Sequence, residues 1–288
     1  MPAATEILQQ VVNGTVIGSV YVLIALGLTV IFGILGVAHF AHGSVAMFGG
    51  YLTYWFAQKF GLSLYPAMLL AIPFGAALGV VLEVVAYRPV RNAAPINAFI
   101  VALGLTMLLD RLNMVVFGPD QLVIRTAYNG VYQVGSVVVT ELRLQVIAIT
   151  VALLFLIGYL IARTATGRAV RAVAQNPYAA TLMGIDVNRI SLLVFAVSSA
   201  LGVVAGAMIG ALLALAPGVG ENLVVKGFAI LILGGLGSIP GAIIGGLALG
   251  ITESLAAGLL SSAYKDVIAF MIMIVVILVR PQGLMGRS

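Results

Sequence analysis

Long, uninterrupted apolar segments constrain this chain more than any other feature of its sequence. Residues 15–36 and 190–215, for example, contain no charged side chain. Only 8% of the 288 residues are charged, against roughly 25% in soluble domains. A helix crosses the hydrocarbon core with about 20 apolar residues, whereas the strands of a membrane barrel alternate apolar and polar residues. The sequence therefore predicts an all-α, polytopic transmembrane bundle of about eight or nine segments.

The apolar pattern predicts nine helical segments. They are residues 15–36, 43–58, 66–87, 95–117, 144–162, 190–215, 223–236, 241–257 and 264–280. Residues 223–236 reach only about 21 Å as a helix, and the sequence that follows, "GGLGSIPG", contains helix-breaking Gly and Pro240. Broken helices lie where they line a cavity or are buried in protein, and in transporters they mark substrate sites. We expect one membrane domain over residues 1–288.

The positions of basic residues predict the orientation, because Lys and Arg collect in cytoplasmic loops. One set of loops holds Arg88, Arg91, Arg163, Arg168, Arg171, Arg189, Arg280 and Arg287. The alternate loops hold Lys59, Arg125, Arg143, Lys226 and Lys265, balanced locally by Asp120, Glu141, Glu221 and Asp266. The rule predicts that the N-terminus lies outside and the C-terminus inside. The net charge of +5 does not predict a nucleic-acid partner.

Glycines recur at every fourth position in the C-terminal third of the chain. The series are Gly202, Gly206 and Gly210; Gly237, Gly241 and Gly245; and Gly246 and Gly250. Small residues at this spacing line one helix face and allow close packing of two helices. In addition, "GSVAMFGG" at residues 43–50 resembles "GSIPGAIIGG" at residues 237–246, which indicates a weak internal repeat with its two copies parallel.

The only two histidines, His39 and His42, lie in the stretch "VAHFAHGSVAMFGG". Residues three apart can share a helix face, but a metal site needs further ligands. The chain has no cysteine, and no acidic residue lies between Glu6 and Glu83, so we predict neither a metal site nor a cofactor. Either the histidines satisfy backbone groups at a helix break, or they line a polar cavity.

The sequence shows no motif for ATP hydrolysis and little sign of ion coupling, the two usual ways of driving transport. A P-loop needs Gly-Lys followed by Ser or Thr, and none of the three lysines follows a glycine. Ion-driven transport would place its coupling on intramembrane acids, for which Glu83, Asp110 and Glu253 are available. Glu83 lies near Arg88 and Asp110 precedes Arg111, so only Glu253 lies well inside a segment. We therefore expect no enzymatic activity, and any ATP hydrolysis belongs to another chain.

Residues 163–189, "RTATGRAVRAVAQNPYAATLMGIDVNR", form the largest predicted cytoplasmic loop. Arg168 and Arg171 share one side of a predicted amphipathic helix. Asn176 is a good N-cap for a second short helix beginning at Pro177, and Gly184 suits its C-cap. The loop is either a basic segment on anionic lipid or a docking element for a partner that moves the membrane helices.

"YAATLMG" in this loop resembles the Glu-Ala-Ala-x-x-x-Gly element by which ABC importer permeases engage their ATPases. Ala179, Ala180 and Gly184 match, and Tyr178 replaces the Glu. More widely, "ALGLTVIFGILGVAHFAHGSVAMFGGYL", "GRAVRAVAQNPYAATLMGID", "GFAILILGGLGSIPGAIIGGLALG" and "RPQGLMG" resemble blocks of branched-chain amino acid ABC permeases. The resemblance covers essentially the whole chain and is to the shorter of the two permease types.

One position departs from the family. His39 replaces the Asn of an Asn-Phe-Ala-His-Gly element, whereas Phe40, Ala41, His42 and Gly43 match it. This departure puts a family role of the first position in doubt.

The resemblance implies a bacterial inner-membrane subunit of an importer for branched-chain or related amino acids. It implies four partners: a second related permease, two cytoplasmic ABC ATPases and an extracytoplasmic substrate-binding protein, in addition to membrane lipid. The substrate path is predicted at His39, His42, Gly43, Ser44, Gly237 and Ser238. The ATPase-coupling loop is predicted at Arg171, Ala174, Pro177, Ala179, Ala180 and Gly184.

Three alternatives to this function stay open at this stage. A urea or short-amide permease of the same family would share these motifs. An ion-coupled secondary transporter would depend on Glu253, and a membrane-embedded scaffold would transport nothing.

Overall fold

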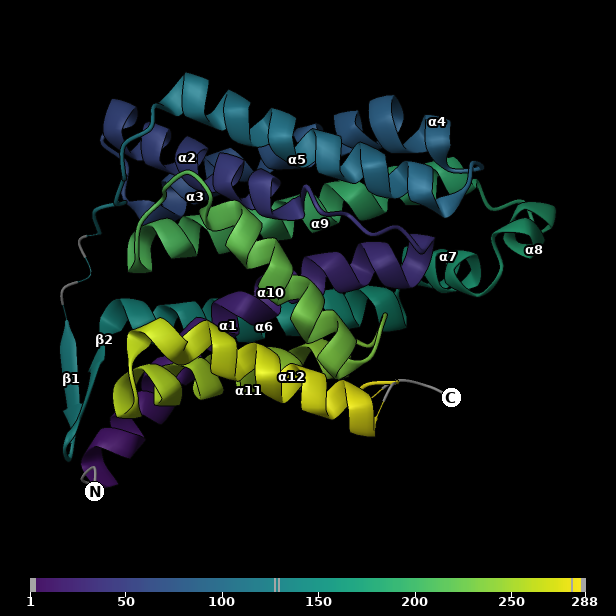
Figure 1. Ribbon diagram of the computed structural model, residues 1–288. Helices are drawn as coiled ribbons and strands as arrows, with labels where there is room; N and C mark the ends of the chain where they lie inside the picture. Colours follow the sequence, from purple (N-terminus) through teal and green to yellow (C-terminus); the bar gives the residue numbers. More distant parts are fainter. Residues whose placement is uncertain (1–3, 127, 129, 281, 286–288) are drawn as a thin grey trace.

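The computed structural model describes residues 4–126, 128, 130–280 and 282–285, and they form a helical bundle with one small hairpin (Figure 1). The helices of the first half are α1 (Ala4–Leu35), α2 (His42–Phe60), α3 (Leu64–Leu82), a π-helical turn (Glu83–Tyr87), α4 (Arg88–Val90) and α5 (Pro95–Phe117). Strands β1 (Val131–Val134) and β2 (Val137–Thr140) follow. The second half contains α6 (Glu141–Arg163), α7 (Ala165–Gln175), α8 (Pro177–Leu182), α9 (Val187–Leu212), α10 (Val219–Gly234), α11 (Ile239–Leu259), a 3-10 turn (Ser262–Tyr264) and α12 (Lys265–Val279).

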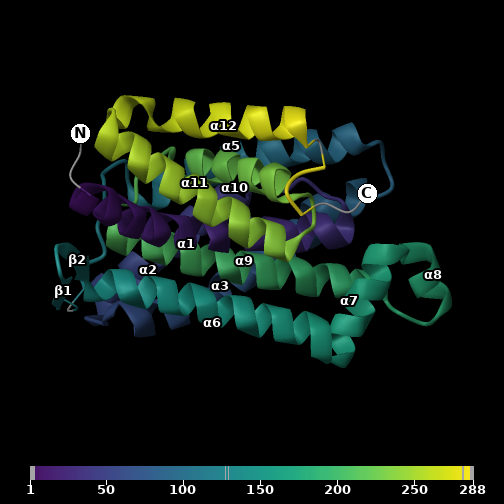
Figure 2. The ribbon, with the colours of Figure 1, turned by 90° about the horizontal axis from the view of Figure 1, so that it is seen from below.

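The long helices lie side by side, and the two ends of the bundle differ (Figures 1 and 2). The N-terminus and the hairpin lie at one end, which we call the hairpin end. Helices α4, α7 and α8 and the C-terminus lie at the other, which we call the α8 end. The Arg-rich loops in the described part of the chain therefore gather at one end, as the alternation of loops predicts, whereas Arg287 lies outside the described residues. Which end faces the cytoplasm stays a prediction.

Seven helical stretches among the described residues are long and apolar enough to cross a membrane. Helices α2 and α10 are not among them, and α10 has only 16 residues. Helix α2 follows a break in the helical chain after α1, and α10 precedes a second break before α11. The nine predicted segments therefore correspond to these seven stretches together with α2, of 19 residues, and α10, of 16 residues, and the prediction of broken helices is confirmed.

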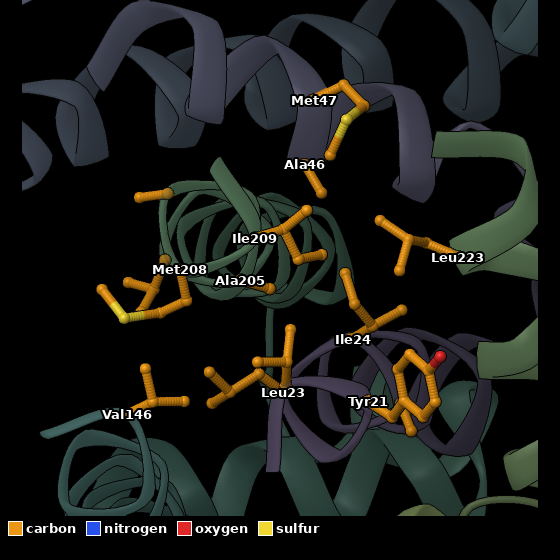
Figure 3. Packing of buried hydrophobic residues seen from close by; sticks show 14 of the residues in the cluster. Tyr21, Leu23, Ile24, Ala46, Met47, Val146, Ala205, Met208, Ile209 and Leu223 are labelled. Atoms are coloured by element: carbon orange, nitrogen blue, oxygen red, sulfur yellow. The ribbon is translucent and has the colours of Figure 1, made fainter. Parts of the chain in front are cut away.

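The core forms where α1 and α9 meet their neighbours. Buried side chains from α1, α2, α6, α9 and α10 interdigitate around α9, as in the packing of Leu23, Ala46, Val146, Met208 and Leu223 (Figure 3). Helix α1 also packs along α11. A Cβ on Gly18 would lie 3.0 Å from the backbone of Gly246. The glycines of α11 thus allow the close packing that their spacing predicts.

The antiparallel hairpin was absent from the predicted elements, which contained only helices and loops. Its strands pair Val131 with Thr140 and Val134 with Val137. The side-chain amide of Gln9 on α1 continues the ladder: its Nε2 donates to the carbonyl of Val138 at 3.0 Å, and its Oε1 accepts from the Val138 N–H at 2.8 Å. One glutamine therefore anchors the hairpin to the bundle.

Lys226 corrects one detail of the predicted loops. It was expected among alternate-loop residues balanced by nearby acids, but it lies within α10 and is 9% exposed. Its nearest partner is Glu253 on α11, at 2.8 Å. A buried ammonium group needs a partner of opposite charge, and the tertiary fold supplies one from 27 residues further along the chain.

Candidate functional site

The first break separates α1 from α2 and carries both histidines. Helix α1 ends at Leu35, and Gly36 has φ 66°, a conformation that favours glycine. The chain then passes through residues 37–41 to α2, which begins at His42. The side chains of His39 and His42 are fully buried. The break therefore brings two polar rings into the interior of the bundle.

His39 is held by residues from two other helical segments. Its Nδ1 lies 2.7 Å from the hydroxyl of Tyr87, in the π-helical turn after α3. Its ring also packs edge-on against Phe195 of α9, with centroids 5.4 Å apart. Single π-turns within helices occur frequently at functional sites. The position that departs from the family is thus a packed contact point between three parts of the bundle.

His42 lies in a space that glycines provide. A Cβ on Gly27 of α1 would come within 2.6 Å of its ring, and one on Gly202 of α9 within 3.2 Å. Ser198 donates to the carbonyl of Gly27 at 2.9 Å, and its Oγ lies 3.5 Å from Nδ1 of His42. Among the described residues, Nε2 of each histidine has no hydrogen-bond partner. Both nitrogens therefore lie in the interior of the bundle, away from solvent.

Gly43 and Ser44 continue this region along α2. A Cβ on Gly43 would collide with the backbone carbonyl of Gly220, at the start of α10. Ser44 is fully buried, and its carbonyl accepts a hydrogen bond from the amide of Asn113 on α5 at 3.2 Å. The start of α2 therefore packs directly against α10 and α5.

The second break, between α10 and α11, uses two glycines and a serine cap. Gly235 and Gly237 have φ 102° and 77°, and Ser238 Oγ accepts from the Gly241 N–H at 3.1 Å. The C-terminal segment covers this break: the N–H groups of Leu284 and Met285 donate to the last carbonyls of α10, at 2.8 and 2.9 Å. A cavity of ≈ 460 Å³ lies beside Gly237 and Ser238.

Both breaks contact α1. His42 lies against Gly27, whereas Gly237 lies against Gly33, and these two glycines are about 9 Å apart along the helix. Predicted substrate-path residues from the two breaks therefore pack against the same helix, α1, at different positions along it. That they line one path stays a prediction.

The predicted coupling loop folds as two short helices at the α8 end. Asn176 caps α8 by accepting from the Ala179 N–H at 3.0 Å. At the other end, the Gly184 N–H donates to Thr181 and the Ile185 N–H to Ala180, each at 3.0 Å, and Gly184 has φ 81°. These bonds are those of a Schellman cap. The predicted caps of this helix are confirmed.

The residues predicted for the loop have unequal surroundings. Ala174, Pro177 and Ala179 are exposed, whereas Ala180 is buried, and Arg171 donates to the Ile161 carbonyl. Apolar side chains that the sequence analysis did not select project from the surface here. They are Tyr178, Leu182 and Met183, which are 76%, 71% and 81% exposed.

A cavity of ≈ 660 Å³ lies between the coupling loop and the first break. Val173 and Pro177 lie on one side of it and Val37 and Ala38 on another, while Tyr87 also contributes to the lining. The loop and the break are therefore two walls of one space.

Two charge clusters complete the polar interior. Fully buried Glu83 binds Arg88 at 2.9 Å and Arg91, and Arg91 also donates to Ser191 of α9 at 2.7 Å. The sequence predicted that Glu83 lies near Arg88, but it did not predict the hydrogen bond from Arg91 to Ser191. Lys226 forms the second cluster with Glu253. Charges inside apolar segments are the signal that could have identified Lys226.

No group of three or more His, Asp or Glu side chains in the described part of the chain is arranged to hold a metal ion. The site consists instead of two helix breaks, a protruding helical loop and closely packed glycines.

A family model described as "Branched-chain amino acid transport system / permease component" matches residues 10–277. The chain belongs to the branched-chain amino acid transport permease family. Among its relatives is the high-affinity branched-chain amino acid transport system permease protein BraD of Pseudomonas aeruginosa. It is 37% identical over 100% of this chain and 98% of the relative. LivH of Escherichia coli, with the same description, is 37% identical over 97% and 96%.

The family membership makes this chain a multi-pass membrane permease component and not itself an enzyme. In addition, the fold resembles PsaBC from Streptococcus pneumoniae in complex with Fab, with a TM-score of 0.51 over 94% of this chain and 91% of that one. The sequence identity of that pair is 12%, so the likeness concerns the fold. The resemblance predicted from the sequence blocks is confirmed.

Proposed function

We propose that this chain is one of two permeases in an ATP-driven importer of branched-chain or related hydrophobic amino acids in a bacterial inner membrane. Two ATPases would bind the α8 end, a substrate-binding protein would dock at the hairpin end, and a second permease would complete the path. Relatives of nearly the same length are described as high-affinity branched-chain amino acid permeases, which supports this substrate class.

The observation that carries the proposal is the surface of α8. Tyr178 and Leu182 on α8 and Met183 directly after it expose most of their surface, and α8 projects beyond the bundle. Large exposed apolar patches mark sites of protein–protein contact. A short helix that is capped at both ends can transmit a force as a rigid unit, because its terminal backbone groups are hydrogen-bonded and the ends resist fraying. We infer that this surface inserts into the ATPase.

The residues that line the ≈ 660 Å³ cavity would transmit a movement of α8 to the first break. Val173 on α7 is fully buried, and it lines the cavity together with residues 37 and 38. When the ATPases close, α7 and α8 would press on this space and shift the break. In our proposal His42, Gly43, Ser44, Gly237 and Ser238 border the path, and the Tyr87 contact fixes His39 beside it.

A matched pair of double variants tests the docking surface. Tyr178→Ser with Leu182→Ser removes apolar area from α8, whereas Tyr264→Ser with Leu260→Ser removes exposed tyrosine and leucine from the loop after α11. After co-expression with ABC ATPase subunits from the same genome, only the α8 variant should lose the co-purifying ATPase. Equal ATPase recovery from both variants would refute docking at α8.

Uptake by the reconstituted complex tests the transport activity. Vesicles that carry the complex in their membrane, with ATP inside and the binding protein outside, should accumulate labelled leucine. Accumulation driven by a proton gradient without ATP would contradict the proposal. Accumulation of urea in preference to leucine would assign the chain to the short-amide permeases, and the absence of any uptake would favour a scaffold.

A further inference from the structure

A second, largely apolar groove lies between α1, α6 and α9 near the α8 end. Its volume is ≈ 280 Å³. Its walls include Ile34 of α1, Ile157 and Leu160 of α6, and Leu193 and Val197 of α9. Leu160 and Leu193 are each 40% exposed, so the groove opens to the outside of the bundle between two membrane-spanning helices, α6 and α9.

Three arginines lie close to the lining residues in the sequence, where α6 ends and α7 begins. Ile161 lines the groove, and its carbonyl accepts from the guanidinium of Arg171. Arg163 lies two residues further on, and Arg168 directly follows Gly167, which also lines the groove. All three arginines are exposed.

The charge at this rim is not balanced locally. Residues 142–185 contain no Asp or Glu. Within the described parts of the chain, no carboxylate lies within salt-bridge distance of Arg163, Arg168 or Arg171. An apolar groove between two membrane-spanning helices thus adjoins a segment with three arginines that no carboxylate balances.

We propose that this groove binds an anionic phospholipid, with one acyl chain between α6 and α9 and the phosphate at Arg163, Arg168 and Arg171. A lipid satisfies both halves of the site at once, because the chain meets apolar walls and the headgroup meets arginine donors, which bind phosphate well. Clusters of basic residues beside a membrane segment attract anionic lipid. A protein partner would have to supply a buried apolar side chain and acidic groups in the same geometry.

Native mass spectrometry of the purified chain in detergent measures this binding directly. Phosphatidylglycerol and phosphatidylcholine with identical acyl chains should bind with different affinities, and the anionic lipid should bind tighter. Arg163→Gln with Arg168→Gln should reduce its affinity about 25-fold, from about fivefold for each charge near a lipid surface. Arg125→Gln, at the hairpin end, is the control and should leave the affinity unchanged.

The apolar half of the site has its own pair of variants. Leu160→Trp fills the groove and should weaken binding of phosphatidylglycerol, whereas Phe155→Trp, at a 76% exposed position of α6 outside the lining, should not. Folding of each variant is checked by its thermal unfolding temperature. If Leu160→Trp unfolds the chain, Leu193→Phe provides a second test of the same groove.

Several results would overturn the inference. One is equal affinity of the unaltered chain for both lipids. Another is lipid selectivity that persists in both the arginine variant and the groove variant. Complete competition by millimolar inorganic phosphate would show a headgroup site without a chain. Loss of co-purifying ATPase from Arg163→Gln with Arg168→Gln, with lipid selectivity intact, would assign the rim to the protein partner instead.

Discussion

The ammonium nitrogen of Lys226 on α10 lies 2.8 Å from Oε1 of Glu253 on α11, although both residues belong to apolar helices. The hydroxyl of Tyr21 on α1 donates to Glu253 at 2.7 Å, and Asp266 of α12 lies 2.9 Å from the same nitrogen. One buried cation therefore ties four helices together. This structural task accounts for an acidic residue in the middle of α11.

Lys226→Met should destabilise the chain strongly, because it leaves Glu253 buried without its cation. Removing one member of a buried ion pair costs about 3–5 kcal/mol. Replacing both members, in Lys226→Met with Glu253→Met, should recover much of this loss. Thermal unfolding in detergent of the two single variants and the double variant measures the coupling. Additive losses in the double variant would show that the two side chains do not act as a pair.

Glu253→Gln distinguishes ATP-driven from ion-coupled transport. Glutamine keeps an acceptor for Tyr21 and leaves Asp266 as the counter-charge of Lys226, but it cannot carry a coupling proton. We expect ATP-driven uptake by the assembled complex to continue, with no dependence on a pH gradient before or after the substitution. Loss of uptake from a variant that still assembles with its ATPases would support the ion-coupled alternative.

Gly184→Val should uncouple the ATPase from the membrane helices. Gly184 has φ 81° with open space around it, so a side chain there strains the C-cap of α8 by about 1–2 kcal/mol. Gly61→Val is the matched control, because Gly61 caps α2 with φ 62° and also has open space. Both variants should lose similar stability, but only Gly184→Val should lower substrate-stimulated ATP hydrolysis. Equal ATP hydrolysis in the two variants would show that Gly184 takes no part in coupling.

Gly43→Ala should disturb the contact between α2 and α10, since the added methyl group meets the backbone of Gly220 rather than a movable side chain. Overpacking of this kind costs about 1–3 kcal/mol. Gly104→Ala on α5 meets nothing within 4 Å and should be neutral or stabilising by up to about 1 kcal/mol. The unfolding temperatures of the two variants should move in opposite directions or at least differ clearly. Similar temperatures would show that α2 and α10 separate without cost.

Tyr87→Phe removes the partner of His39 and leaves a buried ring nitrogen unsatisfied. The expected loss is about 1–3 kcal/mol of stability, together with slower transport because the first break loses an anchor. Tyr159→Phe, at a 62% exposed position of α6, removes a hydroxyl from the surface and should change neither. If the two variants behave alike in unfolding and uptake, the bond to His39 does not hold the break.

Much of the candidate site follows from short-range signals in the sequence. The helix ends at residues 35 and 234, the caps at Asn176 and Gly184 and the shortness of α10 all arise from local preferences of Gly, Pro, Asn and Ser. The hairpin was not predicted, because four-residue strands between long helices carry a weak pattern. Its stability depends on Gln9, which is distant in sequence.

The sequence by itself determined that this chain spans a membrane, where its helices break and which loop projects from the bundle. These features depend on apolar length, charge placement and capping, which are set by residues close together in the sequence and need no tertiary contact. Only the tertiary structure decided that Tyr87 holds His39, that Lys226 binds Glu253 and that Gly43 meets Gly220. Such contacts join residues 27 to 177 positions apart, and they form only when whole helices pack closely enough to exclude every alternative partner.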